Sequence, residues 1–262
     1  MADAGSYRES HTDSGRGRRY DRFYSTDPWV RFLWLREQQV LEDILHTYFA
    51  GGEVNLLDFA CGTGRIAGFL ESRVATAVGV DISEPMLEAA RQNLKRTELI
   101  SADLTRDTVL QGRRFNLITA FRFFTNAEPE LRREALKALV PLLAEDGCMV
   151  FNNHRNRSSP TMVLGHAVQT RPAGPHIRVM SIAEMRNLVA PFGLEMVKIY
   201  PIGLWPSPIG RLPLSWHHAI DHVAQRIGWL AHFSQSPVAV FRRRSWLAMA
   251  RAGEKGRADG IR

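Results

Sequence analysis

The first part of the chain shows two patterns of apolar residues, a helical spacing followed by a short continuous run. Over residues 20–50 they recur at spacings of three and four, which is the pattern of a helix with one buried face. Gly51 and Gly52 are expected to end this helix. The run Val54 to Ala60 is too short for a helix and lies between glycines, so it predicts a buried strand.

The same alternation continues along the rest of the chain. We expect helices at 65–72, 85–95, 129–143 and 182–192, and strands at 77–81, near 99, and at 115–120, 147–153, 193–200 and 238–250. Strands that alternate with helices predict a parallel sheet with helices on both faces. The fold class is therefore α/β, a doubly wound and mostly parallel seven-stranded sheet.

One domain is predicted for residues 20–252, because 262 residues with 45% apolar content suit a single sizeable core. The polar leader 1–19 and the tail 253–262 are expected to be disordered. Residues 20–50 form an N-terminal helical lid in this interpretation. Residues 201–237, which are rich in Pro, Trp and His, are interpreted as a late helical insertion on the substrate side.

Charge and cysteine content limit the partners and the compartment. The net charge of +7 favours encounters with anionic molecules, although part of it lies in the two tails. The basic cluster 242–244 is read as a solvated strand edge, so a nucleic-acid partner is disfavoured. Cys61 and Cys148 are too few for a disulfide framework, and no signal-like or membrane-spanning apolar run occurs. We expect a cytoplasmic protein with at most peripheral membrane contact.

The turn after the first strand carries the candidate chemistry. Gly62 and Gly64 follow Asp58 in the run 58–65, and residues without a β-carbon let the backbone come close to a ligand. Asp81 ends the second strand, 23 positions after Asp58, where a carboxylate can bind the hydroxyls of a ribose. Together these residues predict a nucleoside-cofactor site at the carboxyl ends of parallel strands.

Asp58, Gly62 and Gly64 resemble the first motif of the class I S-adenosylmethionine-dependent methyltransferases, and the resemblance covers about residues 54–153. It implies a Rossmann-like methyltransferase fold with a cofactor-binding core over that range, and S-adenosylmethionine as cofactor. It also implies that Asp81 binds the ribose and Asp103 the adenine amino group. Further cofactor contacts are expected from Ala60, Ile82, Met86, Ala102, Leu104 and the leader residue Tyr20. Asn116 departs from the family's usual Asp at a strand start, away from the cleft.

Candidates for acceptor binding lie after the fourth and fifth strands and in the insertion. His154 directly follows a strand and is the candidate general base, with an ordinary loop histidine as the plainer interpretation. Arg122 stands among three phenylalanines and could hold an acidic or polar acceptor. In the plainer interpretation the three phenylalanines belong to the core and the Arg122 side chain extends from it into water. His217 is a weaker substrate-side candidate. No metal site is expected, because no Cys or carboxylate joins the histidines at ligand spacing.

Two other functions compete with methyl transfer. The run 62–67 also fits the looser dinucleotide fingerprint of NAD(P)-dependent oxidoreductases, but the Asp58 carboxylate would face a pyrophosphate unfavourably. A non-catalytic binding module with this fold would have no need of Gly62, Gly64 and Asp81. The favoured reaction is methyl transfer to an oxygen of a small molecule or a glycan- or lipid-like acceptor. The acceptor itself, the role of the tails and the oligomeric state stay open.

Overall fold

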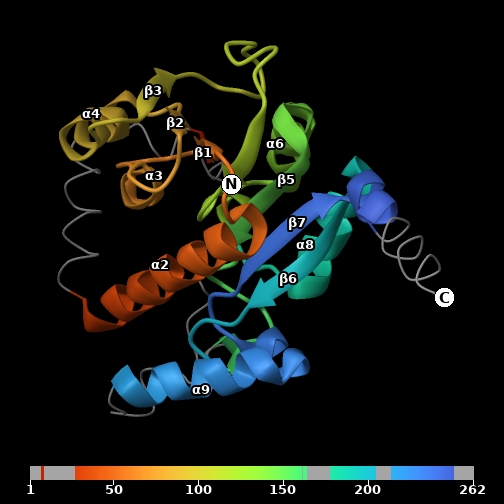
Figure 1. The fold of residues 1–262 in the computed structure, drawn as a ribbon. Coiled ribbons are helices and arrows are strands. Elements are labelled where there is room, and N and C mark those ends of the chain that lie inside the picture. Colours follow the sequence, from red (N-terminus) through yellow and green to blue (C-terminus); the bar gives the residue numbers. More distant parts are fainter. Residues whose placement is uncertain (1–6, 9–26, 161, 164–177, 205–213, 251–262) are drawn as a thin grey trace, which may run out of the picture.

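The computed structural model describes residues 7–8, 27–160, 162–163, 178–204 and 214–250. Its centre is a seven-stranded sheet in the order β3-β2-β1-β4-β5-β7-β6 (Figure 1). The strands are β1 Asn55–Phe59, β2 Thr76–Asp81, β3 Glu98–Ser101, β4 Phe115–Thr119, β5 Leu143–Asn152, β6 Leu194–Tyr200 and β7 Val238–Arg243. The first five strands pair in parallel, and β7 runs antiparallel between β5 and β6. The predicted fold class is therefore confirmed.

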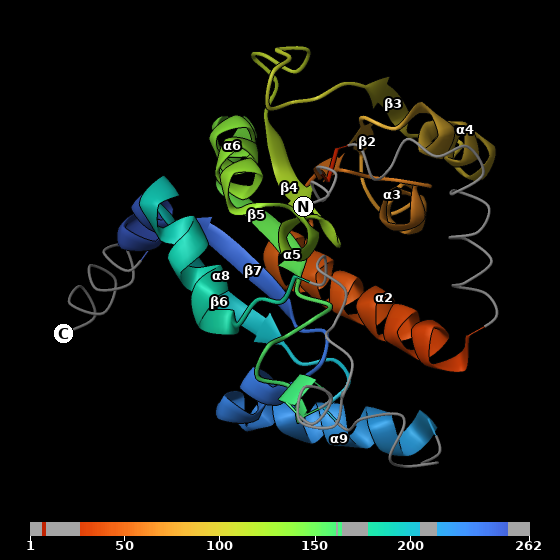
Figure 2. The ribbon, with the colours of Figure 1, turned by 180° about the vertical axis from the view of Figure 1, so that it is seen from behind.

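Helices cover both faces of this sheet, as the two opposite views in Figures 1 and 2 show. They are α2 Pro28–Phe49, α3 Arg65–Leu70, α4 Glu84–Asn93, α5 Phe123–Asn126, α6 Pro129–Leu139, α8 Ile182–Val189 and α9 Leu214–Arg226, with short 3-10 turns at Val140–Leu142, Ala190–Phe192 and Gly228–Phe233. Apolar side chains of α2 and α3 pack on one face, and those of α5, α6 and α8 pack on the other. Removing these apolar surfaces from water is the main force that holds the layers together.

The long helix α2 shows how local sequence sets an element's start. The Asp27 carboxylate accepts hydrogen bonds from the Trp29 and Val30 backbone N–H groups, both at 2.9 Å. Pro28 occupies the first turn, where its missing N–H costs nothing. Within the described residues the helix thus begins at Pro28, whereas the apolar pattern predicted a start at residue 20; residues 20–26 lie outside the described part.

The structure corrects the predicted end of the last strand. Strand β7 stops at Arg243, and residues 244–250 are helical rather than extended. The run from Trp246 to Ala250 consists of Trp, Leu, Ala and Met, with no β-branched side chain, and Ala, Leu and Met are good helix formers. The four-residue helix α5 was not predicted either, because one helical turn is too short to show a period.

The sheet order reverses between β1 and β4, and this reversal positions the candidate site. Strands β2 and β3 lie on one side of β1, whereas β4 and β5 lie on the other. In open α/β sheets, ligands bind outside the carboxyl ends of the strands at such a switch point. The loops after β1, β2, β3 and β4 therefore all meet at the edge where the sequence predicts a cofactor.

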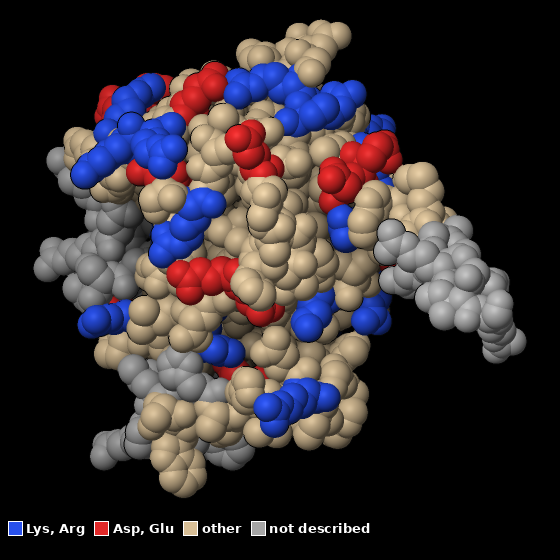
Figure 3. All heavy atoms as spheres, in the orientation of Figure 1, with Lys and Arg blue, Asp and Glu red and all other residues tan. Residues whose placement is uncertain are grey.

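Figure 3 shows basic and acidic side chains interspersed over one face of the molecule. Mixed signs do not produce the single-sign field with which a basic patch attracts nucleic acid. Among the described residues, no helix has both the length and the apolar character needed to cross a bilayer.

Candidate active site

The turn between β1 and α3 takes left-handed backbone conformations at alternate residues. The φ angles are 54° at Ala60, 57° at Gly62 and 78° at Gly64. A β-carbon on Gly64 would lie 2.6 Å from Cδ1 of Leu94, so this position needs glycine for both dihedral and space. The turn is closed by a hydrogen bond of 3.0 Å from the Gly64 N–H to the Cys61 carbonyl. Gly62 and Gly64 thus leave two positions of the turn at the carboxyl end of β1 without a side chain.

A pocket of about 470 Å³, including its open mouth, lies at the carboxyl ends of β1, β2 and β3. The pocket is lined by Tyr7, Arg8, Phe59, Ala60, Val80, Asp81, Ile82, Ala102, Asp103, Leu104, Thr105, Phe123 and Leu131. It thus brings together six of the predicted cofactor residues, namely Ala60, Asp81, Ile82, Ala102, Asp103 and Leu104.

Asp81 ties the glycine turn to the end of β2. Its Oδ2 accepts a hydrogen bond from the Gly62 N–H, and its Oδ1 accepts one from the Ser83 N–H, both at 2.8 Å. These two bonds fix the orientation of a carboxylate that also lines the pocket. A carboxylate has about four lone-pair sites, so it can accept bonds from ligand hydroxyls as well.

Asp58 lies behind the turn and not among the lining residues. Its side chain is 1% exposed and accepts hydrogen bonds from the Thr119 hydroxyl, at 2.7 Å, and the Ala67 N–H, at 3.2 Å. Burial raises the pKa of this carboxyl to about 7, against the lowering effect of the two hydrogen bonds. In this structure Asp58 joins β1, β4 and α3, and a direct contact with the methionine end of a cofactor stays a prediction.

Three more predicted cofactor residues lie outside the lining of this pocket. Gly62 and Gly64 form the turn at its border, and Met86 is buried beneath that turn. The Met86 Cε lies 3.3 Å from the place of a β-carbon on Gly62, so the side chain supports the turn by packing. Tyr20 lies outside the described residues.

The opposite wall of the pocket includes two residues that the sequence analysis assigned to a disordered leader. The Arg8 guanidinium donates hydrogen bonds to Asp103 Oδ2, at 2.9 Å, and to Thr105 Oγ1, at 2.6 Å. The Tyr7 ring packs edge-on against Phe123, with 5.4 Å between ring centres. Hydrogen bonds from Thr105 and the charge of Arg8 lower the pKa of Asp103 despite its partial burial. Tyr7 and Arg8 are the described residues of the predicted leader, and the boundary at residue 19 stays a prediction.

Arg122, the N-cap residue of α5 after β4, has a left-handed conformation with φ 62°, which is uncommon for a residue with a β-carbon. The Arg122 N–H donates to Asn152 Oδ1 at 2.7 Å, and Asn152 Nδ2 in turn donates to Glu37 Oε1 at 2.9 Å. Glu37 also pairs with Arg65, at 2.6 Å, just after the glycine turn. This buried network connects α2 and α3 with the ends of β4 and β5, where Arg122 was predicted to meet an acceptor.

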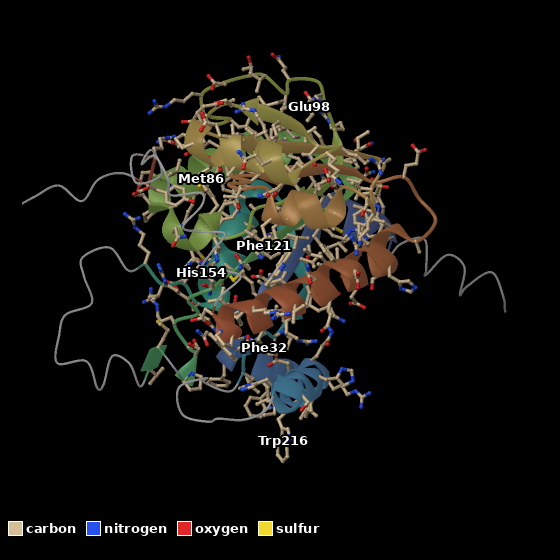
Figure 4. All side chains as sticks on the ribbon, turned by 90° about the vertical axis from the view of Figure 1, so that its left-hand side faces the viewer. Phe32, Met86, Glu98, Phe121, His154 and Trp216 are labelled. Atoms are coloured by element: carbon tan, nitrogen blue, oxygen red, sulfur yellow. The ribbon has the colours of Figure 1, made fainter. Side chains whose placement is uncertain are left out.

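His154 follows β5, and Figure 4 shows it with Phe121 between the levels of Met86 and Phe32. Its Nδ1 is buried and has no hydrogen-bond partner in the described part of the chain. Burial lowers the pKa of His154 well below its usual value, and the charges of Arg122 and Arg155 lower it further. The imidazole is therefore neutral at physiological pH and is a weak base.

His217, the third acceptor candidate, lies in a different environment. Its ring packs between α9 and α2, with ring centres 5.2 Å from Trp29 and 5.3 Å from Phe32, and it is 4% exposed. These contacts stabilise the seating of α9 on α2. A role of His217 toward an acceptor stays a prediction.

Known proteins resemble the part of the chain that forms this pocket. A family profile described as a methyltransferase domain matches residues 56–147. A protein of Geobacillus sp. (strain WCH70) named as a methyltransferase is 29% identical over 139 residues, which are 52% of this chain and 54% of that protein. The trans-aconitate 2-methyltransferase of Rhodopseudomonas palustris (strain HaA2) is 26% identical over 179 residues. That alignment covers 66% of this chain and 65% of the relative.

Solved structures share the fold at lower sequence identity. The magnesium protoporphyrin IX methyltransferase of Synechocystis PCC 6803, solved with bound SAH, superposes with a TM-score of 0.62 at 16% identity, covering 90% of this chain and 97% of its own. The plantazolicin methyltransferase BpumL, in complex with SAH, gives a TM-score of 0.59 at 17% identity, with coverages of 90% and 94%. At such identities the likeness shows the fold alone.

Proposed function

We propose that this protein is a class I S-adenosylmethionine-dependent methyltransferase that transfers the cofactor's methyl group to an oxygen atom of a small-molecule acceptor. The observation that carries the proposal is the pocket itself. It places Ala60, Asp81 and Asp103 at the carboxyl ends of three parallel strands, at the border of the glycine turn. The match to a methyltransferase profile favours this function over the NAD(P)-dependent oxidoreductase, which the spacing of the glycines alone also allowed.

The residues of the pocket fit a nucleoside cofactor. In the proposed arrangement Asp81 accepts hydrogen bonds from the ribose hydroxyls, while Ile82 and Ala102 flank the adenine ring. Asp103 and Leu104 bind the adenine edge. The backbone of the turn from Ala60 to Gly64 holds the methionine end, with Asp58 supporting the turn from behind.

When bound, S-adenosylmethionine supplies a methyl group that its sulfonium already activates. The protein then has to orient the acceptor oxygen and exclude water, and alignment alone can remove a large part of the barrier. The ends of β4 and β5 suit this task, because Arg122 and His154 lie there. The buried hydrogen bonds from Arg122 through Asn152 and Glu37 to Arg65 connect these strand ends with the residue that follows the glycine turn. The lowered pKa of His154 favours an acceptor that needs no strong base.

Two relatives support an oxygen acceptor. Both are named trans-aconitate 2-methyltransferases, from Rhodopseudomonas palustris and from Paracidovorax citrulli, at 26% and 24% identity. Aconitate is a carboxylic acid, so the nucleophile that it offers is oxygen. The following experiment distinguishes a small-molecule acceptor from a glycan- or lipid-like one.

The test is transfer of label from [methyl-¹⁴C]S-adenosylmethionine to fractionated cell extract, with Asp81→Ala as the matched inactive variant. We expect wild-type protein to label the small-molecule fraction and the variant to label nothing above background. Label confined to the lipid, glycan or protein fraction would contradict a small-molecule acceptor. Labelling that the two proteins perform equally would contradict the proposed cofactor site.

A further inference from the structure

Two arginine side chains, those of Arg155 and Arg178, donate hydrogen bonds to Asn126, the last residue of α5, and Asn126 itself bonds the backbone of Arg122. Asn126 Nδ2 donates to the Arg122 carbonyl at 2.6 Å, and Arg155 Nη1 donates to Asn126 Oδ1 at 3.2 Å. Arg178 Nη1 donates to the Asn126 carbonyl at 2.6 Å. Helix α5 begins at Phe123, which lines the cofactor pocket. Positive charge is thus gathered at the ends of β4 and β5, next to that pocket.

The carboxylates near this cluster are paired with arginines other than Arg155 and Arg122. Glu128 pairs with Arg178 at 2.9 Å and accepts the Tyr7 N–H at 3.0 Å. Glu37, on helix α2, pairs with Arg65. Within the described ranges, no carboxylate forms an ion pair with Arg155. The cluster therefore carries more positive than negative charge.

Arg155 is half-buried and lies near another cation. Burial lowers the pKa of its guanidinium, and the charge of Arg122 lowers it further. A guanidinium removed from water and placed beside a like charge is destabilised, and an anion bound there would offset much of that cost. Arg is also the side chain whose planar fork of donors best fits a carboxylate.

His154 completes the surroundings of this cluster. It stands between Asn153 and Arg155 in sequence, and its buried Nδ1 has no partner in the part of the chain described. Burial, and then the charges of Arg122 and Arg155, lower the pKa of His154 and keep its ring neutral. A neutral imidazole has one N–H donor to offer an anion and one unprotonated nitrogen.

We propose that Arg155, with Arg122 and His154, binds a carboxylate of the acceptor, so that the reaction is methyl-ester formation. This inference rests on the proposed function and adds the chemical class of the acceptor. A lone pair of the carboxylate oxygen forms the new O–CH₃ bond. The C–S bond breaks, and its electron pair stays on sulfur as the neutral thioether of S-adenosylhomocysteine. A carboxylate is already ionised at neutral pH, so no proton has to be removed.

The binding test uses protein saturated with S-adenosylhomocysteine and titrated with citrate, fumarate and trans-aconitate. Arg155→Met is compared with Arg157→Met, because Arg157 is an exposed neighbour paired with Glu184. We expect Arg155→Met to weaken binding of the acid at least about tenfold, as loss of one partner of a desolvated charge pair does. Arg157→Met should bind the acid like wild type, and all three proteins should bind S-adenosylhomocysteine equally.

The chemical test asks which bond the transferred methyl group forms. A methyl ester releases labelled methanol in mild alkali, whereas methyl ethers and N-methyl groups keep their label. We expect alkali-labile product from wild type and from Arg157→Met, and much less from Arg155→Met. Alkali-stable product, equal acid binding by the two variants, or binding of none of the three acids to the wild type would overturn the inference. Failure to bind S-adenosylhomocysteine at all would instead overturn the proposed function.

Discussion

Replacing Gly64 by alanine tests whether the glycine turn is shaped by both its dihedral and its space. The added methyl group would lie 2.6 Å from Cδ1, 2.9 Å from Cγ and 3.2 Å from Cδ2 of Leu94. Because Cγ is among these atoms, rotation of the end of the Leu94 side chain alone does not remove the overlap. The φ of 78° adds a dihedral that residues with a β-carbon rarely adopt.

The two effects give separate magnitudes. A left-handed residue with a β-carbon costs about 1–2 kcal/mol, and overpacking by one methyl group costs about 1–3 kcal/mol. Gly64→Ala should therefore destabilise the fold by about 2–5 kcal/mol. For a chain of this size, a loss of about 3 kcal/mol lowers the melting temperature by about 6–12 °C.

The matched control is Gly112→Ala, because Gly112 has a φ of 84° but nothing lies within 4 Å of its added β-carbon. Gly112→Ala should lower the free energy of unfolding only by the cost of the left-handed dihedral, about 1–2 kcal/mol. Urea and thermal unfolding of both variants, and of Gly64→Ala combined with Leu94→Ala, measure the difference. The double variant should be more stable than the sum of its single effects predicts. Equal losses at Gly64 and Gly112, with additive behaviour of the double variant, would refute the steric argument.

Two further predictions concern a buried carboxyl and the N-terminal wall of the pocket. The folded pKa of Asp58, about 7, lies above its ordinary value of 3.8, so the folded state binds more protons across that window and wild-type stability falls as pH rises through it. Asp58→Asn stays neutral, so its stability relative to wild type in urea should improve from about pH 5 to about pH 8, and a constant difference would argue against the raised pKa. Arg8→Ala removes the bonds to Asp103 and Thr105 and should raise the Kd for S-adenosylhomocysteine about tenfold in calorimetry, whereas Arg113→Ala, which breaks a surface pair with Glu98, should not. Equal Kd values for those two variants would remove Arg8 from the pocket.

Features encoded by neighbouring residues could be predicted from the sequence. The run from Val54 to Ala60 between glycines indicated β1, and the spacing from Asp58 to Asp81 placed a carboxylate at the end of β2. In a parallel sheet, strand ends that follow one another along the chain meet at one edge, so these local patterns were enough to locate the pocket.

The remaining parts of the site depend on pairs of residues far apart in the chain. Arg8 and Asp103 are 95 positions apart, and nothing in the polar leader distinguishes Arg8 from its neighbours. Arg155 joins Asn126 across 29 positions through a one-turn helix without a periodic signal. Asp58 matched a ligand-binding motif, yet its buried bonds to Thr119 and Ala67 appear only once β1, β4 and α3 are packed together.

The most direct test of the cofactor site is calorimetric titration with S-adenosylhomocysteine of the wild-type protein and of Asp81→Ala, with NADH as the control ligand. Asp81 lines the pocket and bonds the Gly62 N–H, so its loss should remove both the ribose contact and the anchor of the turn. We expect the wild-type protein to bind S-adenosylhomocysteine, the variant to bind it at least about a hundredfold more weakly, as removal of charged hydrogen bonds does, and NADH to give no heat. Equal binding by both proteins, or binding of NADH instead, would contradict the assignment of this pocket to S-adenosylmethionine.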